Sequence, residues 1–127
     1  MLVDDDFDDN FFHERVIRNN NAADHVVVKQ TGKDALEYLQ SKKDDINTHP
    51  SLIFLDINMP GMNGWEFLEE YKKLDKKFQS TAIVIMLTTS ANPDDNRKAI
   101  LFNGVTDFKR KPLTKEILEE VIYKYFH

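Results

Sequence analysis

Side chains that could carry out phosphoryl-transfer chemistry follow short apolar runs at four places in the chain. Carboxylates follow two of these runs, hydroxyl groups follow the third, and basic groups follow the fourth. In chain order the residues are Asp4 and Asp5, Asp56, Thr88 and Thr89, and Lys109, Arg110 and Lys111. Carboxylate oxygens are the ligands that a small hard cation such as Mg²⁺ selects, and phosphoryl transfer needs a nucleophile and nearby positive charge. The residue types therefore predict a Mg²⁺-binding phosphoryl-transfer site.

The apolar runs have the length and composition of buried strands. Continuous apolar stretches rich in β-branched residues are typical of parallel strands that are covered on both faces. We expect strands at Met1–Val3, His25–Lys29, Ser51–Leu55, Ala82–Leu87 and Val105–Phe108. Because a strand usually has about five residues, either the first strand is unusually short or the chain begins after residues that would extend it.

Segments with helical periodicity separate these strands. We expect helices at about Asp8–Asn20, around Ala35, Leu36 and Leu39, and at Gly64–Leu74, Pro93–Phe102 and Thr114–Phe126. Thr114 is a suitable N-cap for the last helix. The alternation of strands and helices predicts a doubly wound α/β domain with a parallel sheet. Ligands of such sheets bind beyond the carboxyl ends of the strands, where the polar residues are.

The first helix has a predicted apolar face and an acidic start. Phe12, Val16 and Ile17 could line its buried face. The acids Asp6, Asp8 and Asp9 are expected mainly to edge the start of this helix, where the helix dipole favours negative charge. Asp4 and Asp5, which directly follow a strand, are instead candidate metal ligands.

Composition and charge indicate one globular domain. The chain has 127 residues, 41% of them hydrophobic and 31% charged, which suits a single domain. The lack of cysteine excludes disulfides, thiolate nucleophiles and cysteine zinc sites. The net charge of −5 equals that of the aspartates among the first nine residues, and this acidic balance argues against nucleic acid as a partner. Without an apolar run of about 20 residues or a signal-peptide pattern, we expect a cytoplasmic protein and no membrane partner.

Four ordered motifs resemble those of the receiver domain of two-component response regulators. They are Val3-Asp4-Asp5-Asp6, the segment Leu55–Gly64, Met86-Leu87-Thr88-Thr89-Ser90, and the segment Phe108–Leu113. The resemblance runs from Leu2 to the end of the chain. It implies that residues 1–127 form one CheY-like receiver domain with a flavodoxin-like fold. That fold has a five-stranded parallel sheet of order 2-1-3-4-5 and five helices.

The resemblance also implies roles for the acidic residues. Asp56 would be the nucleophile that accepts a phosphoryl group from the phosphohistidine of a sensor histidine kinase or phosphotransfer protein. Mg²⁺ would be bound directly by Asp5 and Asp56 and through water by Asp4. The main-chain carbonyl of Asn58 would be the third direct protein ligand.

Further roles are implied for residues after the last two strands. Thr88 would hydrogen-bond the phosphoryl oxygen, and Lys111 would pair with the acyl phosphate. Phe108 stands at the aromatic switch position of the family, and Thr88 would couple it to the site. The Lys111–Pro112 peptide would be cis. Phosphorylation would change the surface made by Pro93–Phe102, Val105–Phe108 and Thr114–Phe126.

The expected function is that of a signalling switch and not of a metabolic enzyme. The chain would accept a phosphoryl group, bind a downstream target protein, and lose the group by hydrolysis. It would be a monomer or a weak phosphorylation-dependent dimer. One alternative is a phosphatase-like hydrolase with an aspartate nucleophile. That class needs a second Asp two residues after the nucleophile, where this chain has Asn58, and usually a cap domain. The other is a vestigial receiver that serves only protein interaction, although all five site positions carry the family's chemistry.

Overall fold

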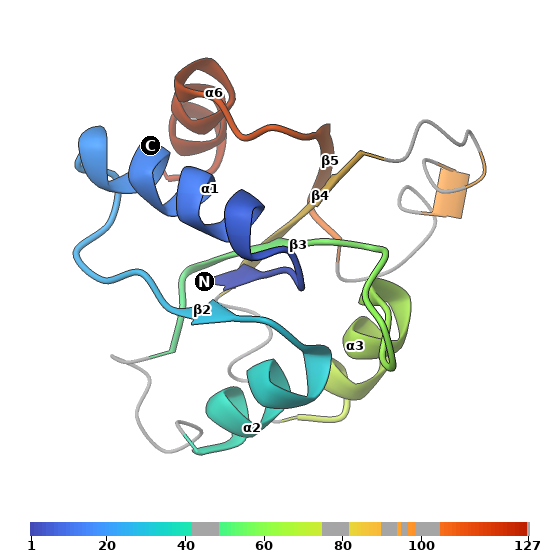
Figure 1. The fold of residues 1–127 in the computed structure, drawn as a ribbon. Helices are drawn as coiled ribbons and strands as arrows, with labels where there is room; N and C mark the ends of the chain where they lie inside the picture. The colour runs from blue at the N-terminus through green and yellow to red at the C-terminus, as the bar shows by residue number, and fades with distance from the viewer. Residues whose placement is uncertain (42–48, 75–81, 90–93, 95–96, 99–104, 127) are drawn as a thin grey trace.

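The fold is built on a five-stranded parallel sheet. A computed structural model of the chain describes residues 1–41, 49–74, 82–89, 94, 97–98 and 105–126. The strands are β1 (Leu2–Val3), β2 (Val28–Lys29), β3 (Leu52–Leu55), β4 (Ile83–Thr88) and β5 (Asp107–Arg110). They lie in the order β2-β1-β3-β4-β5 (Figure 1), which confirms the expected topology. The order reverses between β1 and β3, which is the place where doubly wound sheets bind ligands.

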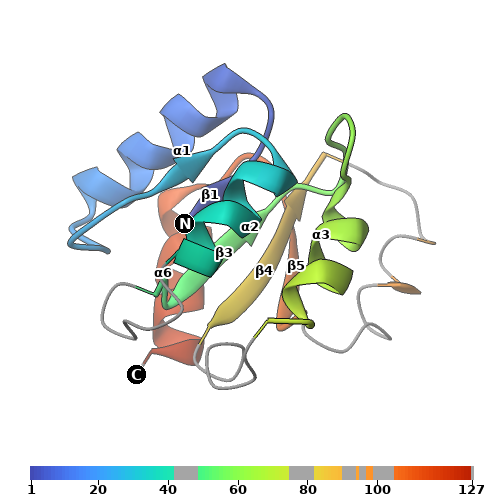
Figure 2. The same ribbon diagram turned by 90° about the horizontal axis from the view of Figure 1, so that it is seen from below.

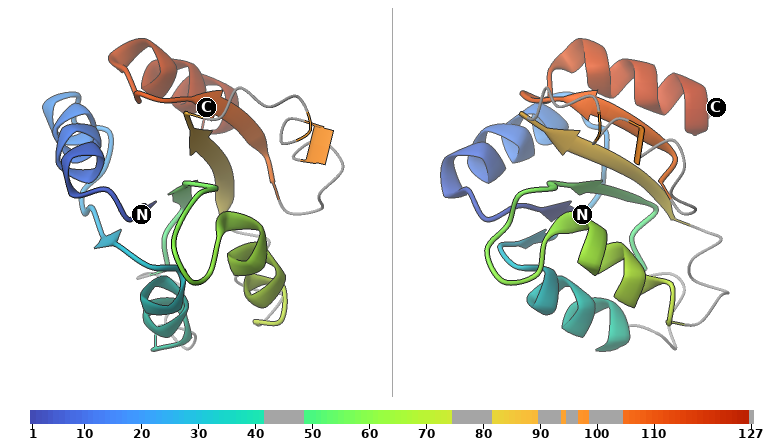
Figure 3. Two further views of the ribbon diagram at one scale, coloured as in Figure 1. Left: turned by 45° about the vertical axis from the view of Figure 1, so that its right-hand side comes forward. Right: turned by 90° about the vertical axis from the view of Figure 1, so that its right-hand side faces the viewer.

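Helices cover both faces of the sheet. The described helices are α1 (Phe7–Asn19), α2 (Gly32–Ser41), α3 (Gly64–Tyr71) and α6 (Lys115–Tyr125). α1 and α6 lie on one face, and α2 and α3 lie on the other (Figure 2 and Figure 3). None of these helices is long and apolar enough to cross a membrane. The helix expected over Pro93–Phe102 lies largely outside the described residues.

Alternate residues of the central strands belong to different cores. In β3, Ile53 and Leu55 pack in the core under α2 and α3, while Phe54 packs in the core under α1 and α6. β4 alternates in the same way, with Met86 in the first core and Ile85 in the second. Successive side chains of a strand point to opposite faces. Burial on both faces explains why these strands are continuous apolar runs in the sequence.

The two edge strands differ from their predicted bounds. The sequence predicts a strand over His25–Lys29, but β2 forms only at Val28–Lys29. The prediction of Val105–Phe108 is wrong at both ends, because β5 runs over Asp107–Arg110. Among the described residues, each of these strands has a neighbouring strand on one side only. Polar side chains are therefore tolerated there, and an apolar run does not mark the ends of an edge strand.

Polar caps fix where three of the described helices begin. Asp6 caps α1 by accepting a hydrogen bond of 3.1 Å from the main-chain N–H of Asp9, which confirms Asp6 at the helix edge. Asn63 caps α3 in a capping box with Glu66. Thr114 caps α6, as predicted. α1 and α3 therefore begin at defined residues close to where β1 and β3 end.

α3 begins against the main chain that follows β3. The N–H of Gly64 donates to the carbonyl oxygen of Ile57 at 2.8 Å. A β-carbon on Gly64 would lie 2.6 Å from the carbonyl oxygen of Asp56 and 3.0 Å from the Cα of Ile57. Main-chain atoms cannot swing aside as a flexible side chain can. The close approach of α3 to Asp56 therefore requires glycine at this position.

Hydrogen bonds of β1 continue to the amino end of the chain. The amino nitrogen of Met1 donates to the carbonyl oxygen of Leu52 at 2.7 Å, and the Met1 carbonyl accepts from Phe54 at 2.9 Å. Burial lowers the pKa of the Met1 amine from 8.0 to about 5. Between these values the unfolded chain binds a proton that the folded chain does not. The contribution of this amine to stability therefore rises with pH across this interval.

Replacing Gly64 with alanine should destabilise the fold. We expect Gly64→Ala to lower the free energy of unfolding by about 1–3 kcal/mol, because the added carbon forces the backbone apart. Urea denaturation measures the loss, and the fluorescence of Trp65, the next residue, should change as well. Gly61→Ala is the control, because nothing lies within 4 Å of its added carbon and only its φ of 76° opposes the change. An unchanged unfolding free energy for Gly64→Ala would contradict the close approach.

Extending β1 should stabilise the chain. Two apolar residues added before Met1 turn the buried amine into an amide and lengthen the strand, so we expect a melting temperature higher by about 5 °C at pH 7. Calorimetry between pH 5 and pH 8 should also show a weaker loss of stability toward low pH. Two added serines supply the amide without apolar surface and should give a smaller gain. An unchanged or lower melting temperature for the apolar extension would show that neither the buried amine nor the short strand lowers the stability of the fold.

Candidate functional site

Three carboxylates meet at the edge of the sheet where β1 and β3 end. Asp4 and Asp5 follow β1, and Asp56 follows β3. One oxygen of each side chain lies within 4.8 Å of the others. Asp4 and Asp56 are buried, whereas Asp5 is exposed. The parallel pairing of β1 with β3 thus brings together the three acids that the sequence predicts as metal ligands.

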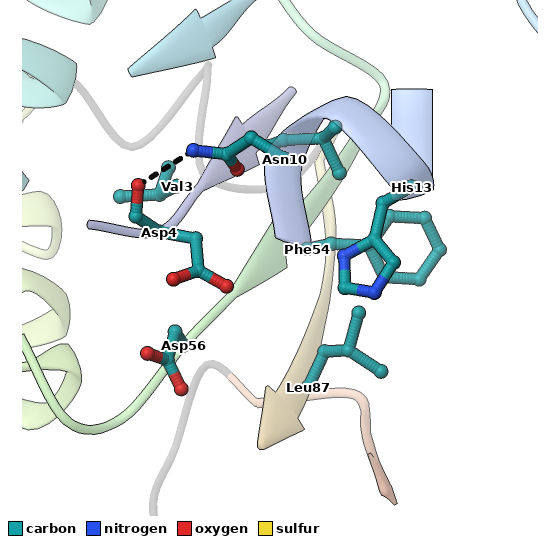
Figure 4. A pocket seen from close by; sticks show the side chains of 8 residues that line it. Val3, Asp4, Asn10, His13, Phe54, Asp56 and Leu87 are labelled. Atoms are coloured by element: carbon teal, nitrogen blue, oxygen red, sulfur yellow. Dashed lines mark hydrogen bonds between the residues drawn. The ribbon is translucent and has the colours of Figure 1, made fainter. Parts of the chain in front are cut away.

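Hydrogen bonds hold the two buried acids in place. The Oδ1 of Asp4 accepts from the main-chain N–H of Asp6 at 3.0 Å. The carbonyl oxygen of Asp4 accepts from the side-chain amide of Asn10 at 2.8 Å (Figure 4). The main-chain N–H of Asp56 donates to the carbonyl of Val3 at 2.9 Å. The carboxylates are therefore positioned jointly by the sheet, the loop after β1, and α1.

The ammonium group of Lys111 lies among these carboxylates. Its Nζ is 2.6 Å from Asp4 Oδ2, 2.8 Å from Asp9 Oδ2 and 3.7 Å from Asp56 Oδ2. Only 8% of the Lys111 side chain is exposed. The peptide between Lys111 and Pro112 is cis, as expected. Lys111 thus brings a buried positive charge from the end of β5 to the acids of β1 and β3.

Burial and neighbouring charges shift the pKa values of this site. Burial, followed by the charge of Asp4, raises the pKa of Asp56 to about 6, although Lys111 opposes the shift. Burial alone would lower the pKa of Lys111. Its hydrogen bonds to Asp4 and Asp9 outweigh burial and raise this pKa above the ordinary value. Lys111 therefore remains a cation, while the Asp56 carboxylate is more basic than an exposed aspartate.

The other predicted site residues lie on three neighbouring segments. Thr88 is fully buried at the end of β4, and its carbonyl accepts from the main-chain N–H of Lys111 at 2.9 Å. Asn58 is exposed, two residues after Asp56, in the loop before α3. Phe108 is half-buried in β5 and packs against the core under α2 and α3. Thr88 is therefore tied to Lys111 through the main chain.

The buried face of α1 differs from the predicted one. Phe12 is 50% exposed, so its prediction as a buried residue is wrong. Ile17 is buried, as predicted, and Val16 packs partly buried against the core under α1 and α6. Asn10 and His13 are buried as well, because the helix is turned so that they line a small cavity beside Asp4 (Figure 4). An apolar pattern could not find this face, since two of its three residues are polar. The signal available in the sequence is that Asn10, His13 and Ile17 are three and four residues apart, which places them on one face of a helix.

Asp9 belongs to the site, although the sequence assigns it mainly to the helix edge. It does lie in the first turn of α1. Its carboxylate, however, accepts a hydrogen bond from Lys111, 102 positions away in the chain. The prediction for Asp9 was therefore incomplete. No local spacing signals this contact, because it depends on how α1 packs beside the end of β5.

The arrangement suits the transfer of a phosphoryl group. Three carboxylate oxygens within 4.8 Å of one another form a donor set that fits a hard divalent cation such as Mg²⁺. Asp56 could act as a nucleophile toward phosphorus. The Lys111 ammonium group could stabilise negative charge on the transferred oxygens.

Known proteins share this sequence pattern and fold. The family model of the response regulator receiver domain matches residues 1–123. The crystal structure of a two-component response regulator from Cytophaga hutchinsonii is 32% identical and matches with a TM-score of 0.89, over 97% of this chain and 92% of that chain. The Mn(2+)-bound form of response regulator Rcp1 is 26% identical and matches with a TM-score of 0.73, over 98% of this chain and 91% of that chain.

A curated relative is longer than this chain. The transcriptional regulatory protein CitT of Halalkalibacterium halodurans is 28% identical over 98% of this chain and 50% of its own length. The chain thus spans about half of that protein. The family model covers nearly all of the chain, and a solved two-component response regulator matches 97% of it. The chain therefore belongs to the receiver-domain family of two-component response regulators.

Proposed function

We propose that residues 1–127 act as one phospho-accepting receiver in a two-component phosphorelay. Asp56 takes a phosphoryl group from the phosphohistidine of a sensor histidine kinase or a phosphotransfer protein. The observation that carries this proposal is the convergence of Asp4, Asp5, Asp56 and the Lys111 ammonium group at one edge of the sheet. This edge lies at the reversal of strand order, between β1 and β3.

Mg²⁺ is the cofactor that suits this donor set. Asp5 and Asp56 would bind the ion directly, Asp4 would bind it through water, and the main-chain carbonyl of Asn58 would be a further ligand. When bound, Mg²⁺ neutralises negative charge on the phosphoryl oxygens. The proposal is supported by the oxygen-only chemistry of the cluster and by the excess of carboxylates over ammonium groups within it.

The residues of the chain divide the chemistry between them. An oxygen of Asp56 forms a bond to phosphorus while the bond from phosphorus to the donor imidazole breaks, and the imidazole leaves with the bonding electrons. Lys111 pairs with a transferred oxygen, and the Thr88 hydroxyl donates a hydrogen bond to another. Water later attacks phosphorus in the acyl phosphate, which releases phosphate and restores the Asp56 carboxylate. The chain is therefore a self-resetting switch and not a metabolic enzyme.

The output of this switch would be a change of surface. Thr88 and Phe108 would couple the phosphoryl group to a surface that includes β5, α6 and the segment Pro93–Phe102. A downstream target protein would bind that surface, with the chain as a monomer or a weak phosphorylation-dependent dimer. We place this exchange in the cytoplasm, with proteins as partners and with no direct contact to nucleic acid or membrane.

The alternative functions fit the site less well. A hydrolase with an aspartate nucleophile needs an acid two residues later, and Asn58 has an amide that cannot exchange a proton in that role. A receiver that serves only protein interaction would not need to keep Lys111 buried against Asp4 and Asp56. Membership of the receiver family also disfavours the hydrolase.

Phosphorylation from a small donor tests the proposal directly. Incubation with acetyl phosphate and Mg²⁺ should add about 80 daltons to the unchanged protein, and hydroxylamine should remove the adduct. Asp56→Asn should give no adduct, while Asp8→Asn, which makes the same charge change at an exposed residue, should still give it. Intact-mass spectrometry measures all three proteins. No adduct on the unchanged protein, or an equal adduct on Asp56→Asn, would overturn the assignment of the nucleophile.

The raised pKa of Asp56 predicts how stability depends on pH and Mg²⁺. The pKa of Asp56 in the folded chain is about 6, which is higher than in the unfolded chain. The contribution of this carboxyl group to stability is therefore present at low pH and is lost as the pH rises through about 4 to 6. In EDTA at pH 7, Asp56→Asn should therefore raise the unfolding free energy by about 2 kcal/mol. The gain should shrink toward pH 4, and Mg²⁺ should stabilise the unchanged protein more than the variant. Urea denaturation measures both trends. If the unfolding free energy gained by Asp56→Asn did not change with pH, the raised pKa of Asp56 would be contradicted.

A further inference from the structure

Lys111 occupies a position between two sets of acids. On the sheet side it lies 2.6 Å from Asp4 and 3.7 Å from Asp56, which belong to the cluster proposed to bind Mg²⁺. On the α1 side it lies 2.8 Å from Asp9, which is outside that cluster. The ammonium group of Lys111 thus already pairs with carboxylates that a divalent cation would also bind.

A cation at the carboxylates and the ammonium group of Lys111 must compete. Two positive charges that share Asp4 repel one another strongly in a site shielded from water. When a divalent cation binds, it neutralises much of the charge of Asp4, so Lys111 loses the benefit of its shortest ion pair. The ammonium group then needs another carboxylate, because a buried cation without a partner is unstable.

Asp9 is placed to be that partner. Its side chain is 38% exposed and already accepts a hydrogen bond from Lys111. Its main-chain N–H is bound by the cap residue Asp6, which fixes the backbone of Asp9 at the start of α1. When a divalent cation binds at Asp4, the carboxylate of Asp9 can therefore keep its ion pair with Lys111 without moving.

We propose that Asp9 is a positioning residue that retains the Lys111 ammonium group on the α1 side of the site and so frees Asp4 for a divalent cation. This inference rests on the proposed Mg²⁺ site. Without Asp9, the carboxylates left within 4.0 Å of Lys111 in the described part of the chain are Asp4 and Asp56. Lys111 would then oppose the cation more strongly.

The affinity for Mg²⁺ alone tests this role, because it can be measured without any phosphoryl donor. Isothermal titration with magnesium chloride should show weaker binding by Asp9→Asn than by Asp8→Asn, by about threefold or more. Asp8 is the matched control, since it is exposed on the neighbouring position of α1 and its change alters the net charge equally. Asp9→Glu should restore part of the affinity. The Asp6 cap is kept in each variant, because it uses the main chain of Asp9.

A Lys111→Met background shows whether Asp9 acts through Lys111. There the Asp9→Asn and Asp8→Asn proteins should bind Mg²⁺ equally. If Asp9→Asn still bound Mg²⁺ more weakly than Asp8→Asn in this background, the positioning role would be overturned, because Asp9 would then act on the cation itself. Equal affinities of the two variants with Lys111 present would also overturn it. No binding of Mg²⁺ by the unchanged protein would instead overturn the proposed Mg²⁺ site, and this inference with it.

Discussion

Like charges a few ångströms apart in a partly buried site repel strongly, and Asp4, Asp5 and Asp56 are held together against that repulsion. The sheet and α1 supply the restraint. Main-chain hydrogen bonds fix the backbone of Asp4 and Asp56, and the side-chain amide of Asn10 donates to the Asp4 carbonyl. Lys111 reduces the repulsion but does not remove it, because one positive charge faces several carboxylates. The fold thus maintains a site with excess negative charge, which suits it to accept and release a positively charged ligand.

The charge of the buried carboxylates explains why the buried face of α1 begins with polar residues, where a helix packed on a core would normally be apolar. The first turns of this helix lie beside Asp4, and apolar groups there would deepen the desolvation of the carboxylate. Asn10 instead donates to the main chain of Asp4, and Asp9 supplies a second acid for Lys111. Ile17, further along the helix, returns to the apolar core shared with α6. One helix therefore serves the site at its beginning and the core near its end.

The fold and most of the site geometry could be predicted from the sequence, and the failures have physical causes. The central strands β3 and β4 are buried on both faces, so their apolar runs match the structure to within a residue. The edge strands β2 and β5 pair on one side only and tolerate polar residues, so their ends were missed. Asp4, Asp5 and Asp56 could be predicted as a cluster because they stand within two residues of the ends of β1 and β3. The contact of Asp9 with Lys111 depends on tertiary packing, which no local pattern records. The buried face of α1 has helical spacing but includes polar residues, so a search for apolar residues missed Asn10 and His13.

The contact between Gly64 and Asp56 has a mechanical consequence for the backbone after β3. α3 starts so close to the carbonyl of Asp56 that the space toward this helix is already filled by main-chain atoms. The main chain of Asp56 therefore cannot move toward α3 without displacing the first turn of that helix. The same residue is also bound to β1, because its main-chain N–H donates to the carbonyl oxygen of Val3. The backbone that carries the Asp56 carboxylate is therefore held between β1 and the first turn of α3.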